Sequence, residues 1–409
     1  MNFSDMDTAT RPARSNIINL IGGTTVRKEP LGPMVAAIAA GCAIILKPSD
    51  VPKASEALIT QMVAKYLDLS AIRCVTAGPA EIQHILDQHI DHSFYTGSAS
   101  VAKIIHAAAA KHLTPVTLEL GGQEPAIVCK SANIDVAAKR IAATKFMNAG
   151  QICLNVNHVL VDPTVRDALV ARLAHHFDMF MGGSARNQPD YYTRIVNERH
   201  FDRLDNLLKQ TSGRLRYGGE RDRAARFMSP SIVAVKPGDC LLNDELFGPI
   251  LPVIDADLDT ALAITRSDEH PLAVYAFTSD AADKKRVLDG CLSGGVTFND
   301  CTLHAAVADA PFGGVGHSGM GYYHGPYGIL AFSHLRTYME GPPAWMQALM
   351  SVRYPPYTLD KAKMLAPKVN PSFDRDGNQR RCGWSVRKWG VGLAAAGAVV
   401  LPWSLRACR

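Results

Sequence analysis

Little in the sequence points to a secreted or metal-binding protein. The nine cysteines include no Cys-x-x-Cys pair, are odd in number and lie mostly in apolar runs. This pattern indicates a reducing compartment and argues against a disulfide framework. The Cys and His residues show no metal-ligand spacing, so we expect no metal site. The N-terminal stretch lacks the apolar core of a secretory signal.

The chain also has no strong excess of one charge. Its net charge of +5 is small for 409 residues, and its basic residues are scattered apart from a concentration near the C-terminus. We therefore expect no nucleic-acid surface and no acidic partner. With 47% hydrophobic residues the chain can bury a large core, and its length predicts two or more domains.

Strand-like and helix-like segments alternate along the chain, which predicts an α/β fold built from βαβ units. The same alternation between residues 155 and 240 predicts a second α/β domain. The main expected strands are 16–23, 43–46, 71–79, 92–96, 114–122 and 125–129, and the main expected helices are 33–41, 51–67, 99–112 and 134–147.

Several polar residues directly follow predicted strands. Lys47 and Asp50 come after strand 43–46, and the Gly97-Ser98 turn comes after strand 92–96. Open α/β sheets bind ligands at the carboxyl ends of their strands, so these residues are candidate ligand contacts. The first-turn amides of the helix after Ser98 can face a pyrophosphate. Each feature also has a plainer explanation, because solvated loop charges and connecting Gly-Ser turns are common.

Cys153 and Glu119 are the candidate catalytic residues. A thiol after the polar turn 148–151 is suited to form a thioester, and a carboxylate can activate the water that hydrolyses it. Considered alone, Cys153 is explained as a small buried hydrophobe and Glu119 as a solvated or capping carboxylate. The glycine-rich segment 311–321 is not a P-loop, because no Lys-Ser/Thr follows its glycines.

Five separated blocks make the chain resemble the aldehyde dehydrogenase superfamily, in its class 3 or fatty aldehyde branch. They are "KPSD", "SFYTGSASVAKIIHAAAAKHLTPVTLELGGQEPAIV", "KFMNAGQICLN", "DELFGPILPV" and "DAPFGGVGHSGMGYYHGPYGILAFSHLR". Blocks in a shared order are harder to obtain by chance than any single motif. The resemblance implies a two-lobed α/β fold, with a Rossmann-like cofactor domain and an α/β catalytic domain.

The resemblance also implies how the chain is divided. We expect a degenerate N-terminal segment (1–29), a truncated NAD(P)-binding domain (30–120), a catalytic domain (121–313), a return segment that closes the active site (314–345), a linker (346–385) and a C-terminal membrane anchor (386–409).

By the same resemblance, individual residues have expected roles. Cys153 is the nucleophile and Glu119 the general base, and we expect a helix to begin at Cys153, where its dipole would lower the thiol pKa. The cofactor contacts implied are Lys47 and Asp50 at the adenosine ribose, Gly97 and Ser98 at the pyrophosphate, Leu120 at the nicotinamide amide, Glu245 and Phe247 at the nicotinamide ribose, and Val101 as apolar lining or simple core.

One part of the sequence departs from the family pattern. Relatives carry further residues upstream, with the first strands of the cofactor domain and a dimerisation arm, which we expect to be missing here. They also place a Trp-Asn pair before the segment at 33–41, and its Asn donates to the developing oxyanion. Thr24 or Thr25 stands near that place instead. Loss of one such donor typically lowers the rate by about a hundredfold to a thousandfold.

The last block predicts a membrane anchor. No charge occurs from Trp389 to Leu405, basic residues flank the stretch, and Trp389 and Trp403 lie near its ends. The stretch is slightly short for a span, so a buried terminal helix is the alternative. Fatty aldehyde dehydrogenases of this class carry a C-terminal anchor, and we therefore expect a tail-anchored protein with a cytosolic catalytic body.

The function expected from these observations is NAD(P)-dependent oxidation of a fatty or other lipophilic aldehyde to its acid. NAD is favoured over NADP, because a carboxylate at Asp50 would repel a 2′-phosphate. A homodimer is a further expectation. Two alternatives remain at this point: an impaired, truncated member that acts as a membrane-associated non-enzymatic protein, and a Cys-dependent esterase that needs no nicotinamide.

Overall fold

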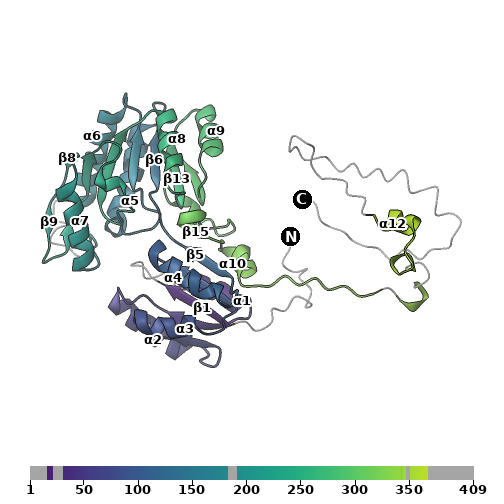
Figure 1. The fold of residues 1–409 in the computed structure, drawn as a ribbon. Helices are drawn as coiled ribbons and strands as arrows, with labels where there is room; N and C mark the ends of the chain where they lie inside the picture. The colour runs from purple at the N-terminus through teal and green to yellow at the C-terminus, as the bar shows by residue number, and fades with distance from the viewer. Residues whose placement is uncertain (1–15, 22–30, 183–190, 342, 347–350, 367–409) are drawn as a thin grey trace. The chain divides into compact units, whose positions relative to one another are not determined.

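A computed structural model describes residues 16–21, 31–182, 191–341, 343–346 and 351–366 (Figure 1). The chain divides into a large unit, residues 1–336, and a smaller one, residues 337–409. The large unit contains a six-stranded sheet and a seven-stranded sheet, and helices cover both. This arrangement confirms the predicted two-lobed α/β fold.

The six-stranded sheet has the order β15-β5-β4-β1-β2-β3. All neighbours are parallel except β15, which runs antiparallel to β5. The five parallel strands have the order β3-β2-β1-β4-β5, which matches five of the six strands of a doubly wound dinucleotide-binding sheet. The strands are β1 (Asn16–Ile21), β2 (Ala43–Lys47), β3 (Ile72–Cys74), β4 (His92–Thr96), β5 (Val116–Glu119) and β15 (Gly319–Met320).

Strand β1 belongs to the middle of this sheet. It pairs with β2 on one side and β4 on the other. The predicted boundary at residue 29 places β1 outside the cofactor-binding domain, whereas the sheet already begins at residue 16. Thr24 and Thr25, expected near the oxyanion position, lie outside the described residues.

The seven-stranded sheet has the order β14-β13-β6-β7-β12-β11-β8, and only β8 is antiparallel to its neighbour. Its central strands are buried on both faces, as in parallel sheets covered by helices. The strands are β6 (Pro125–Val128), β7 (His158–Val161), β8 (Arg214–Tyr217), β11 (Ser231–Ala234), β12 (Ile250–Asp255), β13 (Ala273–Phe277) and β14 (Gly295–Phe298), and β9 (Arg221–Asp222) pairs with β10 (Phe227–Met228) as a separate ribbon.

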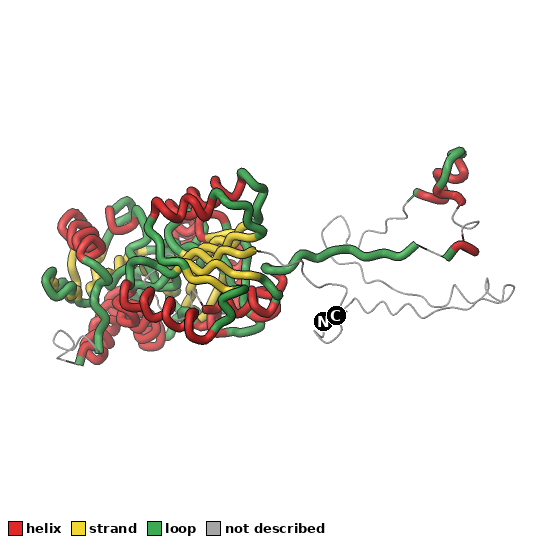
Figure 2. The backbone as a smooth tube through the Cα atoms, turned by 90° about the horizontal axis from the view of Figure 1, so that it is seen from below, coloured by secondary structure: helices red, strands yellow, loops and turns green. Residues whose placement is uncertain are grey.

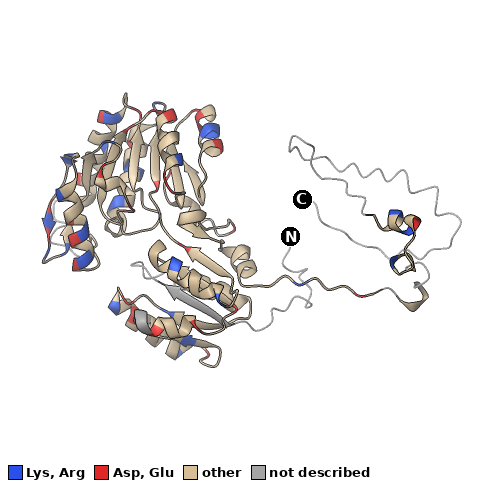
Figure 3. Cartoon of the chain, in the orientation of Figure 1, with Lys and Arg blue, Asp and Glu red and all other residues tan. Residues whose placement is uncertain are grey.

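The helices lie on the outer faces of the sheets (Figure 2), and α7 and α9 are rich in charged residues (Figure 3). Asn or Asp side chains cap α5, α7, α8 and α9 by accepting a first-turn amide, as sequence preferences predict. The helices are α1 (Leu31–Ala39), α2 (Lys53–Tyr66), α3 (Pro79–Leu86), α4 (Ala99–Ala110), α5 (Ile134–Phe146), α6 (Arg166–Met181), α7 (Glu198–Gln210), α8 (Leu258–Ser267), α9 (Ala281–Gly290) and α10 (Gly325–Ala331).

The smaller unit contains short helices where we expected an extended linker. Within the predicted linker 346–385 lie the 3-10 turn η9 (Ser351–Arg353) and helix α12 (Leu359–Leu365). Thr358 caps α12 by accepting from Lys361 N. The predicted anchor, 386–409, falls outside the described residues. Within the described part of the chain, no helix has the length and hydrophobicity needed to cross a bilayer.

Candidate active site

Three predicted site residues meet at the carboxyl edge of the six-stranded sheet. Lys47 ends β2, Gly97 follows β4, and Glu119 ends β5. The strands between them are parallel, so all three strand ends lie at one edge. The amide of Gly97 donates to the carbonyl oxygen of Glu119 at 3.0 Å. The candidate pyrophosphate turn is therefore in direct contact with the residue predicted to be the general base.

Glu119 has an unusual environment for a carboxyl group. Its side chain is only 3% exposed, and neither carboxyl oxygen has a hydrogen-bond partner within the described residues. Burial raises the pKa of Glu119 well above its ordinary value, because a low-dielectric surrounding disfavours the charged form. Buried polar groups without a partner are rare and concentrate at functional sites. The plainer explanation, a solvated or capping carboxylate, does not apply.

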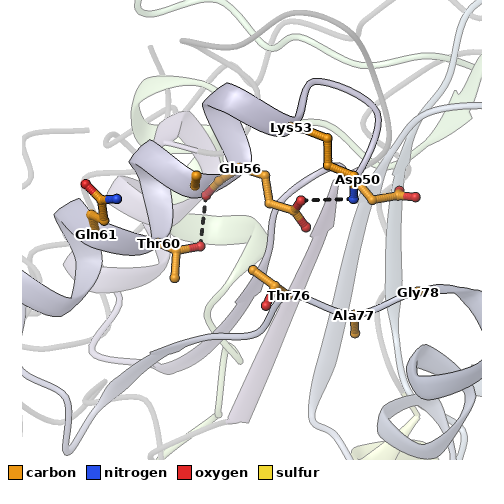
Figure 4. A pocket seen from close by; sticks show the side chains of 9 residues that line it. Asp50, Lys53, Glu56, Thr60, Gln61, Thr76, Ala77 and Gly78 are labelled. Carbon is orange, nitrogen blue, oxygen red and sulfur yellow. Dashed lines mark hydrogen bonds and ion pairs between the residues drawn. The ribbon is translucent and has the colours of Figure 1, made fainter. Parts of the chain in front are cut away.

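Asp50 lines a pocket at the carboxyl ends of β2 and β3, and Lys47 forms an ion pair with Asp50. Lys47 is 5% exposed, and its Nζ lies 3.4 Å from Asp50 Oδ1. The pocket has a volume of about 660 Å³ and is lined by Asp50, the first turns of α2 and residues 76–78 (Figure 4). A pocket at this edge is where doubly wound sheets bind nucleotides, so these residues fit the adenosine part of a dinucleotide.

The Gly97-Ser98 turn opens α4 as predicted. Ser98 is the N-cap residue but makes no side-chain cap, so the first-turn amides of α4 remain available to a ligand. Gly97 has a φ of 156°, a backbone conformation that glycine readily adopts. Val101 is 42% exposed on α4, which does not fit the simple core explanation. The adjacent Ala102 is the buried residue of this turn.

Residues 147–157 join α5 to β7 and are here called the nucleophile loop, after the role predicted for Cys153. It begins with the 3-10 turn η3 (Met147–Gly150), in which Asn148, Ala149 and Gly150 all have positive φ angles. Non-glycine residues in this region cost roughly 1–2 kcal/mol each. Asn148 Nδ2 donates to Gln151 O at 2.8 Å and closes the predicted polar turn.

Cys153 lies in a turn of this loop and not at the start of a helix. Residues 153–154 form a hydrogen-bonded turn, and β7 begins at His158, so no helix follows the thiol. The predicted helix dipole at Cys153 is therefore wrong for this structure. The physical reason is local: Asn155 Nδ2 donates to Gly150 O at 2.8 Å, and such side-chain bonds compete with helix formation. Cys153 itself is half-buried.

Glu245 and Phe247 lie in a loop before β12, here called the ribose loop (residues 245–248) after the contact predicted for these two residues. Glu245 is half-buried, and its Oε1 is fully buried without a partner among the described atoms. Burial raises the pKa of Glu245 to about 8, although the nearby positive charges of Arg203 and Lys145 act to lower it. Its carboxylate packs against Gly121, where an added Cβ would lie 2.4 Å from Oε2.

The contacts of the ribose loop join the two candidate catalytic segments. At one end the Glu245 carboxylate touches Gly121, close in the chain to Glu119. At the other end Gly248 O packs against Gly150, close in the chain to Cys153. Leu120 donates its backbone amide to Ser318 O at 3.1 Å, which leaves its carbonyl oxygen as the atom for the predicted nicotinamide contact.

A doubly wound sheet with a nucleotide-sized pocket, beside a second parallel sheet that presents a half-buried thiol, defines a dinucleotide-dependent oxidoreductase. Residues 29–338 match the profile of the Aldehyde dehydrogenase family. The chain belongs to the aldehyde dehydrogenase family, whose members oxidise aldehydes with NAD or NADP. The resemblance inferred from the sequence is confirmed.

Two relatives match most of the chain. Aldehyde dehydrogenase family 3 member A2 of Mus musculus is 39% identical over 373 residues, covering 86% of this chain and 76% of the relative. Beta-apo-4'-carotenal oxygenase of Neurospora crassa is 39% identical over 397 residues, covering 91% of this chain and 74% of the relative.

Solved structures agree with this assignment. The substrate-bound AldH of Staphylococcus aureus has a TM-score of 0.78 and 34% identity, covering 86% of this chain and 77% of that one. An NAD+ complex of a Mycobacterium tuberculosis aldehyde dehydrogenase has a TM-score of 0.69 and 25% identity, covering 79% and 68%. An NADP complex of a Methanocaldococcus jannaschii glyceraldehyde-3-phosphate dehydrogenase has a TM-score of 0.68 and 25% identity, covering 80% and 73%.

Some residues of the site were missed from the sequence. Lys53, Glu56 and Thr60 line the pocket from one face of α2, and Lys53 Nζ lies 3.3 Å from Glu56 Oε2. Their spacing of three and four residues after the Lys47–Asp50 segment was the available signal. Two buried residues that contact the ribose loop were also missed: Lys145 in α5 and Asn157 at the end of the nucleophile loop. Both lie in segments whose sequence pattern predicts only a helix or a strand, so that pattern gives no signal of a functional role.

Proposed function

We propose that this chain oxidises lipophilic aldehydes to carboxylic acids, with Cys153 as nucleophile, Glu119 as general base and NAD as the preferred hydride acceptor. The observation that carries the proposal is the buried, unpartnered carboxyl group of Glu119 at the carboxyl end of β5. A group in that state is suited to take a proton from a water molecule and is poorly suited to a purely structural role.

The proposed reaction begins with attack by the Cys153 thiolate on the aldehyde carbon, which forms a C–S bond and a thiohemiacetal. Collapse of this adduct expels the aldehydic hydrogen as hydride and leaves a thioester on Cys153. NAD, when bound, supplies the acceptor for that hydride. Glu119 then takes a proton from water, the water oxygen attacks the thioester carbon, and the C–S bond breaks to release the acid and the thiolate.

The residues at the sheet edge suit a dinucleotide. Lys47 would hold the adenosine ribose from the end of β2. Glu245 would hold the nicotinamide ribose, for which it has a buried oxygen that no described residue contacts by a hydrogen bond. Gly97 and Ser98 would hold the pyrophosphate at the start of α4. Asp50 supports NAD over NADP, because its carboxylate would repel a phosphate on the ribose 2′ oxygen.

The lipophilic substrate class is supported by one relative and by the tail. The Neurospora crassa relative carries an apocarotenal in its name, and the uncharged stretch from Trp389 to Leu405 fits a tail anchor. Fatty aldehydes and apocarotenals partition into bilayers, so an anchored enzyme would meet them there. Flotation with neutral lipid vesicles tests the anchor: the full chain should float, and a chain that ends at residue 385 should stay in the aqueous fraction.

The central experiment measures NADH formation from hexadecanal by wild type and Cys153→Ala. We expect the variant to lose at least about a thousandfold in kcat/KM, because no other group replaces the nucleophile. Cys291→Ala, a buried thiol at the end of α9, is the matched control and should retain activity near wild type. Equal rates in wild type and Cys153→Ala would exclude Cys153 as nucleophile.

A further inference from the structure

The ribose loop is tied to the nucleophile side of the molecule by two buried hydrogen bonds. The amide of Leu246 donates to Asn157 Oδ1 at 2.8 Å. Lys145 Nζ donates to the carbonyl oxygen of Gly248 at 3.3 Å. Asn157 is 2% exposed and Lys145 is 0% exposed, so neither bond competes with water. Both ends of the ribose loop are thus held from the side that carries Cys153.

Asn157 also contacts the segment that crosses from the first sheet to the second. Its backbone amide donates to Glu124 O at 2.8 Å, directly after the crossing from the first sheet to the second. Asn157 Nδ2 has no hydrogen-bond partner within the described residues, so only the side-chain oxygen of Asn157 acts in this contact. Asn157 thus joins the end of the nucleophile loop to the crossing segment through its backbone and to the ribose loop through its side-chain oxygen.

The backbone of the two loops also approaches closely at glycine. An added Cβ on Gly150 would lie 2.3 Å from Gly248 O, and Gly150 has a φ of 71°. No larger residue can occupy this position without separating the loops. On the other side, Arg203 Nη1 donates to Glu245 O at 3.5 Å and its Nη2 donates to Leu246 O. The ribose loop is therefore clamped from two sides.

We propose that Lys145 and Asn157 are positioning residues that fix the distance between the nicotinamide-ribose carboxylate of Glu245 and the nucleophile Cys153. This inference rests on the proposed function, in which hydride passes from the Cys153 adduct to a nicotinamide held by Glu245. Neither side chain touches the reacting atoms. They act through the ribose loop, which they hold against the nucleophile loop.

The physical consequence is a specific kinetic defect. Misplacement of reacting groups by about 1 Å can lower a rate by roughly a hundredfold. A shift of the ribose loop should therefore slow hydride transfer and weaken NAD use. It should not affect acylation of Cys153 by an ester, a reaction that needs no nicotinamide. The two activities separate a positioning role from a general loss of folding.

The experiment compares Asn157→Leu, Asn157→Asp and Lys145→Met in the full-length chain. Asn157→Leu removes the acceptor for Leu246 N. Asn157→Asp keeps an acceptor oxygen there and replaces the amide nitrogen, which has no partner among the described residues, with a second, ionisable oxygen. Thr144→Val is the matched control, since Thr144 is 3% exposed beside Lys145 and donates to Ile141 O of its own helix. The readouts are kcat and KM for NAD, the isotope effect with 1-deuterated hexadecanal, and NAD-free hydrolysis of an activated aryl ester.

We expect Asn157→Leu and Lys145→Met to lose roughly ten- to hundredfold in kcat/KM for NAD and to show a larger isotope effect, with ester hydrolysis close to wild type. Asn157→Asp should recover most of the loss, and Thr144→Val should behave like wild type. An equal fall of both activities in Asn157→Leu, or no fall in either, would overturn the inference. Wild type that hydrolyses the ester but forms no NADH would overturn the proposed function and this inference with it.

Discussion

The burial of the Glu119 carboxyl group makes the free energy of unfolding depend on pH. Burial raises its pKa above the ordinary value of 4.5. As pH rises from that value, the unfolded chain loses this proton first, so the native state binds more protons than the unfolded state. The free energy of unfolding then falls with rising pH across this window. A buried carboxyl group thus lowers stability at the pH where a general base is useful.

Glu119→Gln tests both consequences. We expect kcat for hexadecanal oxidation to fall by roughly 10²–10⁴-fold and the acidic limb of its pH profile to disappear, because the base is gone. We also expect the free energy of unfolding in urea to decline less between about pH 5 and about pH 8 than in wild type. A variant with wild-type kcat, or with an unchanged pH dependence of stability, would contradict this role for Glu119.

Asp50 gives a residue-scale prediction on cofactor choice. Its side chain is 47% exposed beside the pocket, so its repulsion of a 2′-phosphate is partly screened. Asp50→Asn should raise kcat/KM for NADP by roughly fivefold, the effect of about 1 kcal/mol between partly exposed charges, and change kcat/KM for NAD less. Asp289→Asn, on the far-away helix α9, serves as control. An unchanged NADP-to-NAD ratio would show that Asp50 does not discriminate.

The sequence located some site residues and not others for a physical reason. Lys47 and Glu119 end predicted strands, and the edge of a parallel sheet gathers such residues whatever the details of packing. Lys145 and Asn157 act through contacts with residues some hundred positions later in the chain, Gly248 and Leu246. No local pattern encodes such a pairing. Only the three-dimensional arrangement reveals it.

At the scale of elements, patterned segments were predictable and the nucleophile loop was not. The expected helix 134–147 agrees with α5, and Asn133 caps it by accepting from Val136 N at 3.1 Å. Hydrophobic periodicity and a cap residue are local signals, so they suffice for such an element. The loop at 147–157 instead depends on left-handed residues and on side-chain bonds from Asn148 and Asn155. Those interactions replaced the expected helix at Cys153.

Gly150 tests how tightly this loop packs on the ribose loop. Gly150→Ala places a Cβ 2.3 Å from Gly248 O at a positive φ, so we expect destabilisation of roughly 1–3 kcal/mol from conformation alone and more from the clash. Gly182→Ala is the matched control, because Gly182 also has a positive φ but has no neighbour within 4 Å of an added Cβ. Urea unfolding should give a clearly larger loss for Gly150→Ala. Equal losses would mean that the loops separate easily.

At the scale of the whole molecule, the proposed active site needs residues from both sheets. The six-stranded sheet holds Glu119 and the candidate contacts for the adenosine ribose and the pyrophosphate, and the loops of the seven-stranded sheet hold Cys153 and Glu245. Ligand binding should therefore stabilise the large unit as one body. The alternative of a non-enzymatic family member predicts no such response.

Thermal unfolding with NAD distinguishes these two outcomes. NAD at 100 times its Kd should stabilise the native protein by about 2.7 kcal/mol, because it binds the folded state only. Lys47→Met should need more NAD for the same shift, whereas Lys285→Met, an exposed lysine on α9, should respond like wild type. Absence of a shift at millimolar NAD and NADP would favour the non-enzymatic alternative.

The pairing of β15 with β5 has a consequence for how the protein is made. Gly319 pairs with Glu119, and Leu120 N donates to Ser318 O, so the outer edge of β5 is covered by a segment synthesised much later. Contacts between segments far apart in sequence form late in folding, and an uncovered strand edge can pair with strands of other chains. A nascent chain stalled before residue 318 would thus be both inactive and prone to aggregate. Rapid synthesis of the chain up to residue 320, or a chaperone bound to the uncovered edge of β5 until then, should therefore raise the yield of folded enzyme.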